Sequence, residues 1–226
     1  MIYFKNVSKI YEPQSIGVRD IHLQIESGEF VSIVGQSGSG KTTLVKLMIA
    51  EERPSKGIVK VSGWDIASIP KKSVSVLRRQ IGVIFQDFKL LHNKTLFENV
   101  AFALEVCGVG NERINEIVPQ VLQIVGLEGK RDRYPHQVSG GEQQRAVIAR
   151  SLVHRPKILV ADEPTGNLDA INTHEIIEIL KKINEFGTTV VLVTHNKEVV
   201  NSLRRRVVTL EHGTVVSDQE GGKYVL

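Results

Sequence analysis

Cysteine, aromatic residues and long apolar runs are scarce in this sequence, and each scarcity excludes a class of protein. Of the 226 residues only Cys107 is a cysteine, which excludes an internal disulfide and any multi-cysteine zinc or iron–sulfur site. Aromatic residues make up 5% of the chain, too few for a surface on which single-stranded nucleic acid stacks. No stretch approaches the roughly 18 consecutive apolar residues of a membrane-spanning helix. We therefore expect a globular protein with no nucleic-acid partner.

Length and charge are ordinary for one globular domain. The chain length suits a single domain of about 200 to 250 residues, and the net charge is +4. Basic clusters at 71–72, 78–79 and 204–206 indicate solvated surface, with contact to anionic lipid headgroups as the alternative. Residues 1–5 lack the charged-then-apolar layout of a signal peptide, so we expect a cytosolic chain.

Residues 35–42 match the phosphate-binding P-loop pattern Gly-x4-Gly-Lys-[Ser/Thr]. The eight residues are Gly35, Gln36, Ser37, Gly38, Ser39, Gly40, Lys41 and Thr42. The apolar run 30–34 precedes the loop as a buried strand does, and helical spacing begins after it at Thr43. Because both flanks fit, a plain Gly/Ser-rich turn is the weaker interpretation. The sequence predicts a nucleotide-binding site here.

Each residue type in this loop has a chemical reason. Glycines let backbone N–H groups turn inward around an anion, and the N-terminal end of the following helix adds positive potential. Lys41 can reach the β- and γ-phosphates, and the Thr42 hydroxyl can bind Mg²⁺. The loop therefore predicts a nucleotide bound together with Mg²⁺.

Predicted strands alternate with predicted helices along most of the chain. Short strands are expected at 2–7, 21–25, 57–63, 81–85, 158–161 and 190–193, and a hairpin at 207–216. Helices are expected at 71–79 and 176–183, and helical spacing indicates a helical insertion from Thr95 to about Leu152. This alternation predicts an α/β fold with a mainly parallel sheet and helices on both faces.

An acidic pair ends the predicted strand 158–161. Asp162 and Glu163 lie at the carboxyl end of a buried strand, where open α/β sheets place their ligands. Asp162 can hold Mg²⁺ through water, and Glu163 can accept a proton from a water in line with the γ-phosphate. An acidic turn is the alternative, but the turn-rich segment 164–169 that follows has no evident packing role. The pair is our candidate for metal binding and general-base catalysis.

Residues 138–142 resemble the signature sequence of the ATP-binding cassette (ABC) ATPases. That motif usually begins with Leu and ends with Gln, where this chain has Val138 and Glu142. The retained centre of the motif is Ser139, Gly140 and Gly141. The same stretch predicts a helix N-terminus, with Ser139 as N-cap and Glu142 closing a capping box. A plain capping turn is compatible with the functional interpretation, because a helix N-terminus also binds phosphate.

Further short motifs follow in the order of this family. Gln86 resembles the Q-loop glutamine that senses Mg²⁺ and water, and His195 resembles the switch histidine that contacts the γ-phosphate. Tyr11 resembles the aromatic residue that stacks on adenine. The D-loop is matched by Asn167, Leu168 and Asp169. The local alternatives are a half-buried aromatic for Tyr11, a surface amide for Gln86 and a structural histidine for His195.

The resemblance covers nearly the whole chain and implies a P-loop NTPase core of ABC type. The core would comprise 1–86, including an N-terminal antiparallel β-region, and 156–226, with a helical subdomain at 87–155. Two copies would pair head-to-tail, with ATP between Lys41 of one and residues 139–142 of the other. The catalytic residues implied are Lys41, Gln86, Glu163 and His195. ATP would then hold the dimer together, and hydrolysis would loosen it.

Four stretches narrow the resemblance within the family. Residues 86–91, 161–169 and 194–198, and the tail 218–224, are similar to those of the members that act in bacterial cell division. This implies a peripheral ATPase on the cytoplasmic face of the membrane, which is bound to an integral membrane subunit and controls cell-wall hydrolases. The lipoprotein-release and macrolide-export ATPases share the sequence of residues 166–169, and membership of one of these groups is the alternative. A soluble ABC ATPase acting on DNA or ribosomes, and a scaffold without turnover, fit the motifs less well.

An apolar run lies just beyond Gln86, where a loop is expected to face outward. It contains Phe88, Leu90 and Leu91. We expect these residues to line a groove that receives a short helix of the membrane partner. The alternative is that they pack the two subdomains together.

Overall fold

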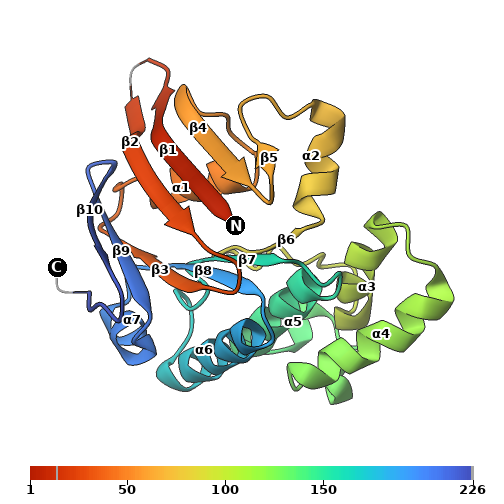
Figure 1. Ribbon diagram of the computed structural model, residues 1–226. Helices are drawn as coiled ribbons and strands as arrows, with labels where there is room; N and C mark the ends of the chain where they lie inside the picture. The colour runs from red at the N-terminus through yellow and green to blue at the C-terminus, as the bar shows by residue number, and fades with distance from the viewer. Residues whose placement is uncertain (14, 225–226) are drawn as a thin grey trace.

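The computed structural model describes residues 1–13 and 15–224, and it contains two β-sheets that both contact α1 (Figure 1). The smaller sheet is antiparallel, and its order is β2 (Ser15–Ile25), β1 (Ile2–Tyr11), β4 (Lys56–Val61) and β5 (Trp64–Asp65). Its first two strands are longer than the sequence predicted. The reason is that β1 and β2 pair along their whole lengths, from Ile2 opposite Ile25 to Tyr11 opposite Ser15.

The larger sheet is mainly parallel, as predicted. Its order is β10 (Thr214–Gln219), β9 (Arg206–Glu211), β3 (Phe30–Val34), β8 (Thr189–Val193), β7 (Ile158–Asp162) and β6 (Ile81–Ile84). Only the pairing of β10 with β9 is antiparallel, and these two strands form the predicted hairpin. Because the other strands run the same way, their carboxyl ends lie at one edge of the sheet.

Both faces of this sheet are buried, which explains the continuous apolar runs in its strands. In β7, Leu159 and Ala161 face the helical side, whereas Ile158 and Val160 face the antiparallel sheet and α1. Successive side chains of a strand point to opposite faces, so each strand contributes to two hydrophobic cores.

The predicted helical insertion is present between β6 and β7. It contains α3 (Leu96–Val106), α4 (Asn111–Ile124) and α5 (Gly140–Leu152), with short 3-10 turns at Glu128–Lys130 and Pro135–Gln137. The other helices are α1 (Lys41–Met48), α2 (Lys71–Arg78), α6 (Ala170–Glu185) and α7 (Lys197–Leu203). Thr95 begins α3 with a capping box closed by Glu98.

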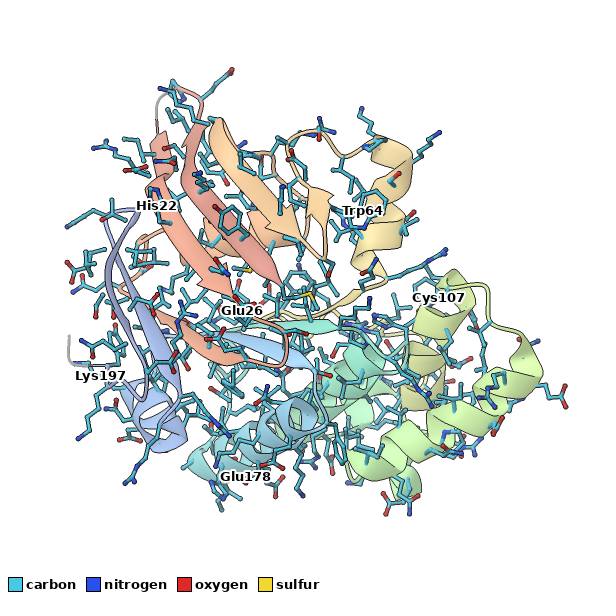
Figure 2. All side chains as sticks on the ribbon, in the orientation of Figure 1. His22, Glu26, Trp64, Cys107, Glu178 and Lys197 are labelled. Carbon is cyan, nitrogen blue, oxygen red and sulfur yellow. The ribbon has the colours of Figure 1, made fainter. Side chains whose placement is uncertain are left out.

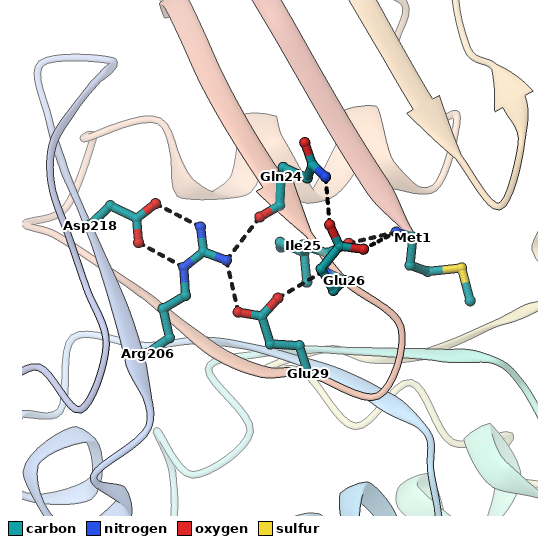
Figure 3. A network of polar contacts seen from close by, with 7 residues as sticks. All are labelled: Met1, Gln24, Ile25, Glu26, Glu29, Arg206 and Asp218. Carbon is teal, nitrogen blue, oxygen red and sulfur yellow. Dashed lines mark hydrogen bonds and ion pairs between the residues drawn. The ribbon is translucent and has the colours of Figure 1, made fainter.

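One arginine joins the end of the antiparallel sheet to the β9–β10 hairpin (Figure 3). Arg206 donates to both carboxylate oxygens of Asp218, at 2.7 and 2.6 Å, and to Glu29 Oε1 at 2.7 Å. It also donates to the carbonyl oxygen of Gln24 at 2.8 Å. The hydrogen bonds that Arg206 donates to Asp218, together with the one to Glu29, raise the pKa of Arg206, so this clamp stays charged at any physiological pH.

None of the helices in the described part of the chain combines the length and the apolar character needed to cross a membrane.

Candidate active site

The P-loop lies between the end of β3 and the start of α1. Gly40 precedes α1 with a φ of 103°, and a Cβ at this position would lie 2.5 Å from the carbonyl oxygen of Gly17. Both the left-handed backbone and the close approach require glycine here. The loop therefore delivers the N-terminus of α1 to the edge of the sheet, where its free N–H groups can receive phosphate.

Lys41 is held inside this loop. Its Nζ donates to the carbonyl oxygens of Gly35 at 2.7 Å and of Gln36 at 2.9 Å. Burial lowers the pKa of Lys41, and the negative charges of Glu163 and Asp162 partly oppose this effect. The lysine thus lies between the loop and the two acids. Its Nζ donates to neutral carbonyl oxygens there, and an incoming phosphate would give it a negatively charged partner.

Glu163 is fixed by groups that follow the neighbouring strand β8. Its Oε1 lies 2.6 Å from Nδ1 of His195, and its Oε2 accepts a hydrogen bond from the Thr194 hydroxyl at 3.0 Å. The backbone of Glu163 has a φ of 49°, and its N–H donates to the carbonyl oxygen of Val193 at 2.8 Å. A non-glycine residue in the left-handed region is strained, and such strain is concentrated at functional sites.

Asp162 ends β7 beside Glu163, and among the described residues it makes no side-chain hydrogen bond. Burial raises its pKa, Glu163 raises it further, and Lys41 and Lys89 oppose the shift. The two neighbouring carboxylates therefore create a local excess of negative charge, which a cation would relieve.

The predicted residues meet in a pocket of about 820 Å³ at this edge of the sheet. Its wall includes the outer P-loop residues, Thr43, Gln86, Asp162, Glu163, His195 and, from the end of β1, Tyr11. Gly35 and Ser39 are buried beneath the loop and do not reach the wall. The volume is in the usual range for a small-molecule site of about 300 to 1,000 Å³.

Comparison with known protein families shows to which family the chain belongs. A model described as ABC transporter matches residues 18–166, which include the P-loop, the 139–142 motif and the acidic pair. The chain belongs to the ABC transporter family.

Individual relatives agree with this assignment. The chain is 48% identical to the cell division ATP-binding protein FtsE of Bacillus subtilis over 224 residues, which cover 99% of this chain and 98% of that protein. It is also 48% identical to the FtsE of Mycobacterium tuberculosis over 225 residues, with the same coverage. A solved dimeric ATP-binding cassette in a post-hydrolysis state with ADP and Pi is 34% identical, with a TM-score of 0.88 over 99% of this chain and 100% of that one. The protein is thus an FtsE-like ABC ATPase.

The ABC signature begins α5, and its local structure is the predicted one. Ser139 is the N-cap and accepts from the Glu142 N–H at 3.3 Å, while Glu142 Oε2 accepts from the Ser139 N–H at 2.9 Å. Glu142 also pairs with Lys130. Ser139 is exposed, and residues 139–142 do not line the 820 Å³ pocket. Within one chain, therefore, the signature is not part of the nucleotide pocket.

The signature packs against the D-loop. A Cβ placed on Gly141 would lie 1.8 Å from Oδ1 of Asn172, and one placed on Gly140 would lie 3.7 Å from Leu168. Asp169 is the N-cap of α6 and accepts from both the backbone and the side chain of Asn172. The signature and the D-loop, which are distant in the sequence, therefore form one surface, and Asn167 is exposed on it.

The expectation for the apolar run after Gln86 was wrong for Leu90. Its side chain is 5% exposed and belongs to the core formed with α3, α5 and the sheet. Phe88 and Leu91 are half-buried. The loop turns at Lys89, which has a φ of 48°, and this turn directs Leu90 inward. Hydrophobic burial thus decides the direction of Leu90, as the packing alternative anticipated.

Three functional neighbours were not predicted from the sequence. Arg150, near the end of α5, donates to the carbonyl oxygens of Lys89 at 2.7 Å and Phe88 at 3.1 Å. Lys197 and Tyr224 line the nucleotide pocket. Lys197 and Tyr224 lie in stretches that carry the resemblance, but the sequence assigns them no role, because each acts on a segment that is distant in the sequence.

The donor set of the pocket fits Mg²⁺. The Thr42 hydroxyl, the Gln86 amide and the Asp162 carboxylate lie on the wall of the same pocket. Oxygen ligands are the ones that Mg²⁺ prefers, and burial together with the neighbouring Glu163 raises the pKa of Asp162, so a cation beside this carboxylate would favour its ionised form.

Proposed function

We propose that this chain is the ATP-hydrolysing subunit of an FtsE-like complex, and that it acts through an FtsX-like integral membrane subunit in cell division and the control of cell-wall hydrolases. One observation carries the catalytic part: Glu163, held by His195 and Thr194, faces the same pocket as the P-loop. The near full-length similarity to FtsE proteins supports the biological part.

The chemistry follows from the positions of the side chains. Lys41 exchanges its bonds to Gly35 and Gln36 for bonds to the β- and γ-phosphates of ATP, and Tyr11 receives the adenine. Thr42, Asp162 and Gln86 would hold Mg²⁺, which would supply positive charge beside the phosphates. Glu163 accepts the proton of the attacking water, and His195 holds that carboxylate in place and contacts the γ-phosphate.

A second copy completes the site. Ser139 is exposed at the N-terminus of α5, and residues 139–142 are separate from the pocket of their own chain. A helix N-terminus binds anions, so the signature of one copy can close over the γ-phosphate bound by the other. ATP then favours the closed homodimer, and hydrolysis favours separation.

Phosphate release by the purified protein tests the catalytic proposal. With Mg-ATP we expect steady turnover, which EDTA removes and which Lys41→Ala abolishes. Absence of turnover both alone and with a co-expressed membrane subunit would contradict an ATPase function.

A separate experiment tests the membrane partner, which we propose binds this chain at the cytoplasmic face of the membrane. Leu91→Glu places a charge in the half-buried part of the loop that also contains Phe88, and we expect it to prevent co-purification with a membrane protein that has a large extracytoplasmic domain. Basal ATPase activity should remain. Ile124→Glu is the matched control, because Ile124 is 70% exposed at the end of α4. Equal loss of the partner in both variants would contradict a docking role for Phe88 and Leu91.

A further inference from the structure

Tyr224 lies on the wall of the nucleotide pocket although it is distant in the sequence from the P-loop, the signature and the acidic pair. It follows β10, and the family model ends at residue 166. The segment 220–224 returns from the β9–β10 hairpin toward α7, where the last described residues lie in Figure 1. The side chain is 5% exposed, which is unusual for a tyrosine at the rim of an open pocket.

The ring of Tyr224 joins three elements around the active site. It forms a small hydrophobic cluster with Val34, Val200 and Val207. Val34 ends β3 and directly precedes the P-loop, Val200 belongs to α7, and Val207 belongs to β9. The ring therefore packs between the base of the P-loop and the helix that follows His195.

Polar contacts reinforce this placement. The backbone N–H of Tyr224 donates to Oδ1 of Asn201 in α7 at 2.8 Å. Nζ of Lys197, at the start of α7, lies 5.7 Å from the ring centroid. Burial raises the pKa of the Tyr224 phenol, and the negative charges of Glu163 and Glu211 raise it further. The neutral ring therefore lies within the electrostatic field of Glu163.

Helix α7 depends on such contacts for its position. It contains only seven residues and begins at an N-cap, Asn196, that directly follows His195. Helices this short are not stable by themselves, so packing determines where α7 lies. Its buried residues Val199 and Leu203 pack on the helical side of the sheet, whereas Val200 packs against Tyr224. Loss of the tyrosine ring would leave the pocket side of α7 without its support.

We propose that Tyr224 is a positioning residue that fixes the position of α7 by packing against it. Through α7 it keeps His195 in contact with Glu163 and keeps Lys197 at the rim of the nucleotide pocket. Tyr224 acts through α7, so its loss should slow the chemical step and leave ATP affinity nearly intact. The proposal rests on the ATPase function proposed above.

Three variants of the full chain test it. Tyr224→Ala should lower kcat by about tenfold, with KM for ATP changed by less than about twofold. Tyr224→Phe keeps the packing and should retain most of the activity. Trp64→Ala is the matched control, because Trp64 is a partly buried aromatic residue on β5, far from α7 (Figure 2). It should leave kcat unchanged.

A spectroscopic measurement separates positioning from general destabilisation. The NMR signals of the His195 ring should shift in Tyr224→Ala and not in Trp64→Ala, and hydrogen exchange in α7 should accelerate only in the former. If Tyr224→Ala does not fold, Asn201→Ala replaces it, since that change removes the acceptor of the Tyr224 N–H and leaves the ring.

Several results would overturn the proposal. These are an unchanged kcat and His195 signal in Tyr224→Ala, a raised KM with normal kcat, or an equal effect of Trp64→Ala. Wild-type turnover is the reference measurement. Its absence would count against the proposed function, whereas an unshifted His195 signal counts against Tyr224 alone.

Discussion

Gly141 of the signature approaches Asn172 of α6 so closely that a Cβ on the glycine would lie 1.8 Å from the Asn172 Oδ1. Asn172 is not free to move away, because its side chain donates to Asp169 Oδ2 at 2.7 Å. The start of the signature helix and the D-loop are therefore fitted to each other. We therefore expect a change on either side of this contact to alter the surface that is proposed to meet the second copy.

Gly141→Ala should destabilise the protein by about 1 to 3 kcal/mol through overpacking, and it should weaken ATP-dependent dimerisation. Denaturant unfolding and size-exclusion chromatography with ATP measure the two effects. Gly140→Ala is the control for stability, because a Cβ there meets its neighbours at ordinary distances of 3.7 Å or more. Adding Asn172→Ala should restore much of the stability of Gly141→Ala. Equal destabilisation by both glycine replacements would contradict the argument.

Glu163→Gln should lower ATP turnover by about 10² to 10⁴-fold, because the amide cannot accept the proton of the attacking water. ATP binding should persist, so the variant should accumulate as an ATP-bound dimer. Single-turnover phosphate release and light scattering with Mg-ATP check both effects. Turnover at the wild-type rate would remove Glu163 from its role.

Arg150→Lys should impair turnover, since one ammonium group replaces the two guanidinium nitrogens that donate separately to the carbonyl oxygens of Lys89 and Phe88, and the fixed fork geometry is lost. The loss of one such hydrogen bond costs about 0.5 to 1.5 kcal/mol in unfolding free energy. Arg53→Lys is the matched control, because Arg53 also donates to two carbonyl oxygens, of Ala67 and Ile69, in the antiparallel region. We expect both variants to lose stability and only Arg150→Lys to lose activity, in assays of denaturation and phosphate release.

Glu142→Gln should change how stability depends on pH. The hydrogen bond from Lys130 and the Ser139 cap lower the pKa of Glu142 below its usual 4.5. The ionised carboxylate therefore stabilises the fold above about pH 4.5, and this contribution disappears as pH falls through the lowered pKa. The wild type should melt above the variant at neutral pH, and the difference in Tm should shrink in acid.

Lys130→Gln provides the control for this titration. Without the cation, Glu142→Gln should change the pH dependence of Tm much less. A constant difference in Tm between pH 7 and pH 3 would show that the ion pair does not contribute.

Local chemistry was sufficient to predict much of this protein from its sequence. The P-loop pattern, the acidic pair after an apolar strand, and the cap at Ser139 all depend on residues within a few positions of each other. The alternation of strands and helices likewise predicted a parallel sheet, which brings separate motifs to one edge because parallel strands share a direction.

Only the tertiary structure decided the features that join distant segments. The inward direction of Leu90, the contact of Gly141 with Asn172, the grip of Arg150 on the loop after Gln86, and the place of Tyr224 in the pocket are of this kind. Burial and shape complementarity between elements determine them, and neither leaves a periodic or short-range signal in the sequence. The sequence by itself therefore determined which chemistry the site can perform, whereas packing decided which residues hold it in place.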